Sequence, residues 1–132
     1  MTLIQGTHHI SLRPCGGTMF DKTVSFYCDI LQLKVVRSWG AGENRGVMLS
    51  TGNSLLEITS NGTSISNDPG NIHHFALTTQ HVDKLIQAVR DAGYSVTMEP
   101  TDVAIPSEPP MPARVAFCIG PVGEAIEFFM EK

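Results

Sequence analysis

The sequence predicts an α+β fold built from two copies of a β-α-β-β-β unit. The first observation is a strand that occurs twice, at Thr7–Arg13 and again at Ile72–Thr78. The second is a later strand in each half that carries one glutamate among apolar residues, Glu57 in the first half and Glu127 in the second. The third is one stripe of apolar residues at helical spacing in each half.

In the first half, alternation of side chains between two faces predicts a strand over Thr7–Arg13. An amphipathic helix ending near Leu31 is predicted by apolar residues at helical spacing, which are Phe20, Val24, Tyr27 and Leu31. Runs of β-branched and other apolar residues then predict three strands, at Leu33–Trp39, Val47–Ser50 and Leu55–Thr59.

The second half repeats this order. A strand is predicted over Ile72–Thr79, and a helix follows from an apolar stripe closed by Gly93, with the stripe at Val82, Leu85, Ile86 and Val89. Three more strands are predicted at Tyr94–Met98, Arg114–Ile119 and Ala125–Met130. We therefore expect one domain, made of module 1–60 and module 71–132 and joined by a polar linker at 61–70.

The halves differ in a proline-rich stretch, Glu99–Pro112, which holds five of the eight prolines. Such a stretch predicts a stiff, extended loop. Long loops in compact domains are often lids or binding loops, but a structural crossing loop on the surface is an equal alternative.

Composition limits the classes of function. A chain of 132 residues with a net charge of −4 has no basic surface for nucleic acid. No apolar stretch approaches the length that spans a membrane. The three cysteines are odd in number and far apart, which fits reduced thiols better than disulfides. We expect a soluble, cytoplasmic protein, and the weak acidic balance says little about a small-molecule substrate.

Strand alternation separates the paired histidines. His8 and His73 share a face with apolar residues, so we expect both to pack against the helices. His9 and His74 fall on the opposite, more polar face, which suits a cleft. The same alternation places Glu57 and Glu127 on the cleft face.

Each half therefore supplies one histidine and one glutamate, and the four side chains are His9, Glu57, His74 and Glu127. Imidazole and carboxylate together suit zinc, nickel, iron, cobalt or manganese rather than calcium or magnesium alone. Taken singly, a strand histidine is more often hydrogen-bonded and a strand glutamate more often solvated. The repetition favours a metal site over those alternatives. Arg13, on the face of His9, either binds an anionic substrate group or pairs with a nearby acid.

Several stretches together resemble the vicinal oxygen chelate superfamily, the glyoxalase/bleomycin resistance/dioxygenase group that includes glyoxalase I. They are His9–Arg13, Ser25–Tyr27, Leu56–Ile58, His74–Leu77, Asp91–Gly93 and Gly120–Glu127. The resemblance implies paired βαβββ modules that form a cupped mixed sheet around a metal. It also implies that the first and last strands of each module are neighbours.

The set of two histidines and two glutamates resembles that of glyoxalase I. This implies a lyase or isomerase that transfers a proton next to a carbonyl through a metal-bound enediolate, with nickel or zinc as the metal and cobalt, manganese or iron as alternatives. Glu127 matches the family base, Glu57 would serve the opposite face, and Arg13 matches an arginine that contacts a substrate carboxylate.

Two other outcomes stay open within the same fold. One is different chemistry, by an epimerase or an Fe(II) extradiol dioxygenase. The other is a non-catalytic protein that binds a small molecule and confers resistance. Because members with two modules per chain usually form dimers, we also expect a homodimer.

Overall fold

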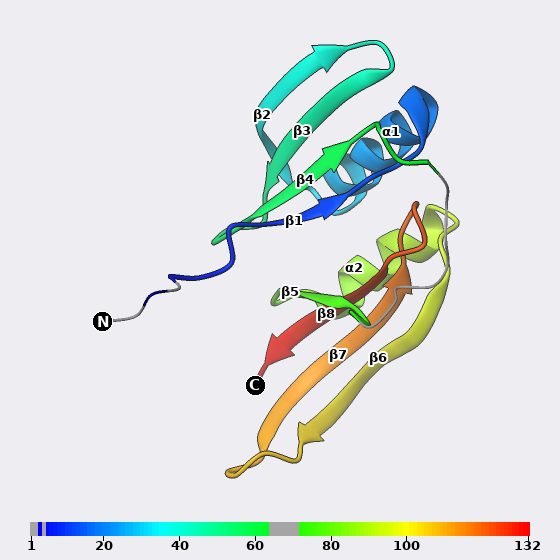
Figure 1. Ribbon diagram of the computed structural model, residues 1–132. Helices are drawn as coiled ribbons and strands as arrows, with labels where there is room; N and C mark the ends of the chain where they lie inside the picture. The colour runs from blue at the N-terminus through cyan, green and yellow to red at the C-terminus, as the bar shows by residue number, and fades with distance from the viewer. Residues whose placement is uncertain (1–2, 4, 64–71) are drawn as a thin grey trace. The chain divides into compact units, whose positions relative to one another are not determined.

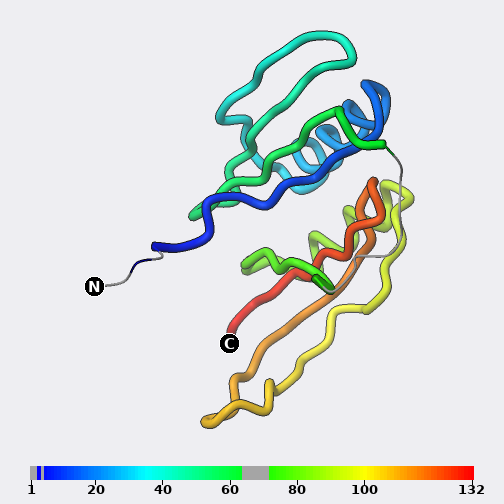
Figure 2. The backbone as a smooth tube through the Cα atoms, viewed as in Figure 1, coloured from blue at the N-terminus to red at the C-terminus, as the bar shows by residue number. Residues whose placement is uncertain are grey.

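The computed structural model describes residues 3, 5–63 and 72–132. The chain forms two compact units, Met1–Ile65 and Ser66–Lys132. Each unit contains one four-stranded sheet and one α-helix (Figure 1), and Figure 2 follows the same backbone as a continuous tube. The predicted α+β class with two β-α-β-β-β modules is confirmed.

The first unit begins with strand β1, His9–Leu12, and helix α1, Gly16–Ser25, which continues as a π-helical turn, η1, at Phe26–Ile30. Three strands follow: β2 at Lys34–Ala41, β3 at Asn44–Ser50 and β4 at Leu55–Thr59. The order across the sheet is β1-β4-β3-β2. The first and last strands of the unit pair in parallel, and the other pairs are antiparallel.

The second unit repeats this arrangement. Its elements are β5 at Phe75–Thr78, α2 at Val82–Asp91, β6 at Val96–Ile105, β7 at Met111–Ile119 and β8 at Ala125–Glu131. The sheet order is β5-β8-β7-β6, again with a parallel pair of first and last strands. The expectation that these strands are neighbours in each module is therefore confirmed.

Each helix packs on one face of its own sheet, α1 against β3 and β4 and α2 against β6, β7 and β8 (Figure 1). The buried side chains between helix and sheet include Phe20, Tyr27, Leu56 and Ile58 in the first unit and Ile86, Val89, Ile126 and Phe128 in the second. Because neighbouring strand residues point to opposite faces, Glu57 and Glu127 must face away from these cores.

The proline-rich stretch Glu99–Pro112 was predicted as a loop, and this is wrong for most of its length. β6 runs on to Ile105 and β7 begins at Met111, so the two strands form a long hairpin. Pro100 falls where the β6–β7 register shifts between Met98 and Thr101. A proline there removes no regular ladder hydrogen bond, and the strand therefore tolerates it.

Both histidine-bearing strands are shorter than predicted, since β1 starts at His9 and β5 only at Phe75. The linker predicted at 61–70 falls mostly outside the described residues, which leave out 64–71. In the described part of the chain, no helix is long and apolar enough to cross a bilayer.

Candidate metal centre

The parallel pair of β1 and β4 brings His9 and Glu57 together. In the register of these strands, Ser11 lies opposite Glu57, and His9 lies two residues before Ser11 on the same face. His9 Nε2 is 4.0 Å from Glu57 Oε1. We call these two residues the first His–Glu pair.

The second unit builds the same pair from β5 and β8. Ala76 lies opposite Glu127 in the register, and His74 precedes β5 by one residue. His74 Nε2 is 3.1 Å from Glu127 Oε1, which is within ion-pair distance. His74 and Glu127 form the second His–Glu pair.

Both carboxylates are largely shielded from water. The side chain of Glu57 is 22% exposed and that of Glu127 only 12% exposed, while both histidines are more open. A carboxylate in an apolar strand is costly to bury without a partner. The more buried glutamate has the closer histidine, so the cost of burying the carboxylate is offset more fully in the second pair.

Each pair has a different neighbour. The hydroxyl of Ser11 donates a hydrogen bond of 3.0 Å to Glu57 Oε1. In the second unit, Phe117 of β7 lies opposite Glu127 and meets the ring of His74 edge-on, with centroids 5.0 Å apart and an interplanar angle of 81°. The sequence analysis did not single out Ser11 or Phe117 as neighbours of the pairs. Ser11 was detectable as the residue two positions after His9 on the same face.

The expectation that His8 and His73 pack against the helices is wrong, because both side chains are exposed. Each ring lies beside its neighbour instead: His8 Nδ1 is 2.9 Å from His9 Nδ1, and His73 Nδ1 is 2.8 Å from His74 Nδ1. The regular alternation of a strand does not apply to them, since His8 precedes β1 and His73 precedes β5.

The chemistry of each pair fits a divalent transition metal. Imidazole and carboxylate bind zinc at about 2.0–2.2 Å, so two ligand atoms roughly 3 Å apart can be neighbours on one cation. The 3.1 Å separation in the second pair meets this condition, and the 4.0 Å separation in the first needs a modest side-chain rotation. Over residues 3, 5–63 and 72–132, no three His, Cys, Asp or Glu side chains are grouped as metal ligands.

Two of the three cysteines, Cys28 and Cys118, are poor candidates for a metal ligand. Cys118 is buried in β7, and burial raises the pKa of its thiol to about 12. Burial also raises the pKa of the Cys28 thiol. Both thiols are therefore protonated at neutral pH, and a protonated thiol is a poor metal ligand.

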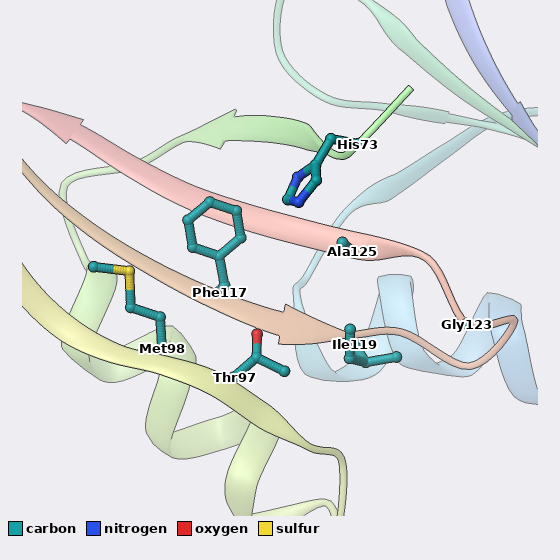
Figure 3. Close-up of a pocket in the computed structure, with 7 residues that line it drawn as sticks. All are labelled: His73, Thr97, Met98, Phe117, Ile119, Gly123 and Ala125. Atoms are coloured by element: carbon teal, nitrogen blue, oxygen red, sulfur yellow. The ribbon is translucent and has the colours of Figure 1, made fainter. Parts of the chain in front are cut away.

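Arg13 directly follows β1 and is exposed. Its side chain is thus accessible to an anionic group in solution. An apolar pocket of about 400 Å³ lies in the second unit beside the second pair (Figure 3), and its lining residues are His73, Thr97, Met98, Phe117, Ile119, Gly123 and Ala125. Phe117 connects the two features, since it lines the pocket and also contacts His74.

Residues 7–107 match the model of the Glyoxalase/Bleomycin resistance protein/Dioxygenase superfamily. The chain belongs to this superfamily. The resemblance expected from the sequence is therefore confirmed.

A lactoylglutathione lyase from Arabidopsis thaliana is 36% identical over 90 residues, which cover 63% of this chain and 32% of that protein. The chain matches only about a third of the length of this plant relative. Two solved structures share the fold. The trypanothione-dependent glyoxalase I of Leishmania major has a TM-score of 0.70 at 24% identity, covering 96% of this chain and 87% of its own. The antibiotic-binding protein TnmS3 from Streptomyces sp. CB03234 has a TM-score of 0.68 at 16% identity, covering all of both chains.

Proposed function

We propose that this protein is a metal-dependent lyase or isomerase of the glyoxalase I type, which transfers a proton next to a carbonyl. The observation that carries the proposal is the His–Glu pair repeated in both units, with Nε2 of the histidine toward Oε1 of the glutamate each time. The lactoylglutathione lyase relative supports the same chemistry.

His9, Glu57, His74 and Glu127 would hold the metal, supplied either by one chain or by two chains of a homodimer. Nickel or zinc suits these ligands best, with cobalt, manganese or iron as alternatives. A bound divalent cation would act as a Lewis acid that stabilises negative charge developing on the substrate oxygens.

The chain's own residues would move the proton. Glu127 is the proposed general base, and Glu57 would accept or donate a proton on the opposite face of the substrate. Glu127 suits the role because its side chain is shielded from water and is held by His74. Breaking that one contact would free the carboxylate to accept a proton.

Substrate binding would use Arg13 and the pocket beside Phe117. The exposed guanidinium of Arg13 would bind an anionic group. The pocket, with Met98, Phe117 and Ile119 in its lining, would hold an apolar part of a substrate.

Metal analysis combined with a substrate panel tests the proposal. The purified protein is expected to bind about one nickel or zinc ion per site and to isomerise a hemithioacetal of an α-oxoaldehyde. A protein that binds no metal and turns over no hemithioacetal would be a binding protein instead. Oxygen consumption with iron and a catechol would favour a dioxygenase, and exchange of an α-proton with racemisation would favour an epimerase.

Two further expectations stay predictions. The homodimer is tested by light scattering of the purified protein, and the cytoplasmic location by fractionation of cells that express it.

A further inference from the structure

Each metal-ligand histidine proposed above has a second histidine directly before it in the chain, and the two rings touch. The Nδ1 atoms of His8 and His9 are 2.9 Å apart, with ring centroids 5.2 Å apart and planes at 83°. The Nδ1 atoms of His73 and His74 are 2.8 Å apart, with centroids 5.0 Å apart and planes at 89°. The same arrangement thus occurs twice in one chain.

Adjacent residues in a regular strand point to opposite faces and do not meet. These pairs meet because each sits at the beginning of its strand, where the backbone has not yet entered the regular ladder. His8 and His73 are both exposed, so core packing does not hold their rings in this position. Each of these rings instead contacts the next histidine, through the Nδ1–Nδ1 hydrogen bond and the edge-on arrangement of the rings.

The bond determines which nitrogen of the ligand histidine is available. An imidazole whose Nδ1 is hydrogen-bonded presents its other nitrogen, Nε2, and in both pairs it is Nε2 that points to the glutamate. A histidine that binds a metal through Nε2 carries its ring proton on Nδ1 and donates it. The neighbouring histidine must then accept through its own Nδ1, as a neutral ring protonated on Nε2.

We propose that His8 and His73 are positioning residues, which accept a hydrogen bond from Nδ1 of His9 and His74 and so fix the rings with Nε2 toward the glutamates and the metal. This proposal rests on the metal centre described under Proposed function. Residues in this role commonly change metal affinity by about 10–100-fold when they are replaced.

The test compares two substitutions at each position. His8→Phe and His73→Phe keep a ring but remove the acceptor nitrogen. His8→Asn and His73→Asn place an amide oxygen close to the position of Nδ1 and so restore an acceptor. His81→Phe is the matched control, because His81 is also exposed and its side chain makes no capping hydrogen bond to α2.

Zinc affinity is measured by competition with a chromophoric chelator, after thermal melting shows that each variant is folded. The Phe variants are expected to bind zinc about 10–100-fold more weakly than the parent protein. The Asn variants are expected to recover most of that loss, and His81→Phe to match the parent. Long-range ¹H–¹⁵N correlation spectra of the zinc-loaded protein should show the ring proton of His9 and His74 on Nδ1.

Two results separate failure of this inference from failure of the proposed function. If the parent protein binds no zinc, cobalt or nickel, both fall together. If the parent binds zinc but the Phe variants bind it equally well, or the Asn variants lose as much affinity as the Phe variants, only the positioning role is overturned.

Discussion

The two modules share one fold and one His–Glu pair, but they hold the pair in different ways. In the first, Glu57 accepts a hydrogen bond from Ser11, and its Oε1 is 4.0 Å from His9 Nε2. In the second, Ala76 occupies the position of Ser11, and Glu127 lies 3.1 Å from His74. The first module fixes its carboxylate, whereas the second fixes its imidazole by the contact with Phe117.

In the proposed function, this difference supports separate tasks for the two glutamates, although they occupy equivalent positions in the repeat. A carboxylate tied by a neighbouring hydroxyl is well placed to remain a metal ligand throughout a reaction. A carboxylate held mainly by its histidine can leave a cation and accept a proton. The contrast therefore supports Glu127 as the base and Glu57 as the more constant ligand.

The largest expected effect is that of Glu127→Gln. The variant should exchange the substrate α-proton with solvent roughly 10²–10⁴-fold more slowly, because the amide cannot accept the proton. Glu57→Gln is the matched variant and should weaken metal binding while retaining more of the exchange activity. The measurement is loss of the substrate α-proton signal in deuterated water by NMR. Full exchange activity in Glu127→Gln would remove Glu127 from the role of base.

The next effect concerns Phe117. Edge-on aromatic contacts contribute about 0.5–1.5 kcal/mol, so Phe117→Leu should weaken zinc binding roughly 2- to 10-fold by loosening His74. Met48→Leu is the control, because Met48 lies opposite Glu57 as Phe117 lies opposite Glu127. Titration with zinc checks both variants. An equal loss in both would show that the ring contact with His74 has no special effect.

Ser11 and Ala76 occupy equivalent positions, so substitutions there can give each module the residue that the other module has. Ser11→Ala should weaken zinc binding about 5-fold, since a single hydrogen bond contributes about 1 kcal/mol. Ala76→Ser places a hydroxyl opposite Glu127 and should slow proton exchange, because a hydrogen bond to the ionised carboxylate makes it a weaker base. The zinc titration and the deuterium exchange assay measure these separately. A variant Ala76→Ser that exchanges protons at the parent rate would contradict the difference in role.

The smallest effect concerns a second repeated contact, outside the metal centre. Arg45 of β3 pairs with Asp21 of α1, and Arg114 of β7 pairs with Asp83 of α2 and also with Asp102 of β6. Hydrogen bonds from Arg114 hold the pKa of Asp83 and Asp102 below the usual range.

Carboxylates with a lowered pKa in the folded state stabilise it above their unfolded pKa, and that stabilisation is lost as pH falls through the folded value. Arg114→Gln should therefore lower the melting temperature at pH 7, and the deficit should shrink as pH falls below about 4. Arg45→Gln, which loses one aspartate partner rather than two, is expected to show a smaller pH-dependent part. Melting curves from pH 3 to 7 measure both, and a deficit in Arg114→Gln that stays constant with pH would contradict the assignment.

Alternation of side chains indicated the faces of His9 and of both glutamates, because all three lie inside regular strands and the residues that flank the glutamates in β4 and β8 are strongly apolar. It failed for His8 and His73, since the rule holds only inside a regular strand and both residues precede one. The prolines of 99–112 were misleading for a related reason. Proline is disfavoured inside a sheet, but Pro100 lies in β6 at the edge of its sheet and at an irregular register, where it is tolerated.

The ion pairs that Arg45 and Arg114 make with aspartates could have been predicted from the sequence but were not. Each arginine stands three residues before the strand residue that lies opposite the glutamate, which is Met48 in the first module and Phe117 in the second. The repeat therefore extends beyond the proposed metal ligands to the contact between sheet and helix. A search for repeated charged residues, rather than for histidines and glutamates alone, would have found it.

The parallel pairing of first and last strands has a consequence for how each unit folds. β1 and β4, like β5 and β8, are separated in the chain by a helix and two strands, so each His–Glu pair forms only when the first and last strands of its unit meet. Such non-local pairing is slow to form, because a long loop must close before the contact is gained. A cation that binds only the assembled pair adds its binding free energy to the folded state. Metal supply would then set how long a newly made chain stays folded, in addition to whether it is active.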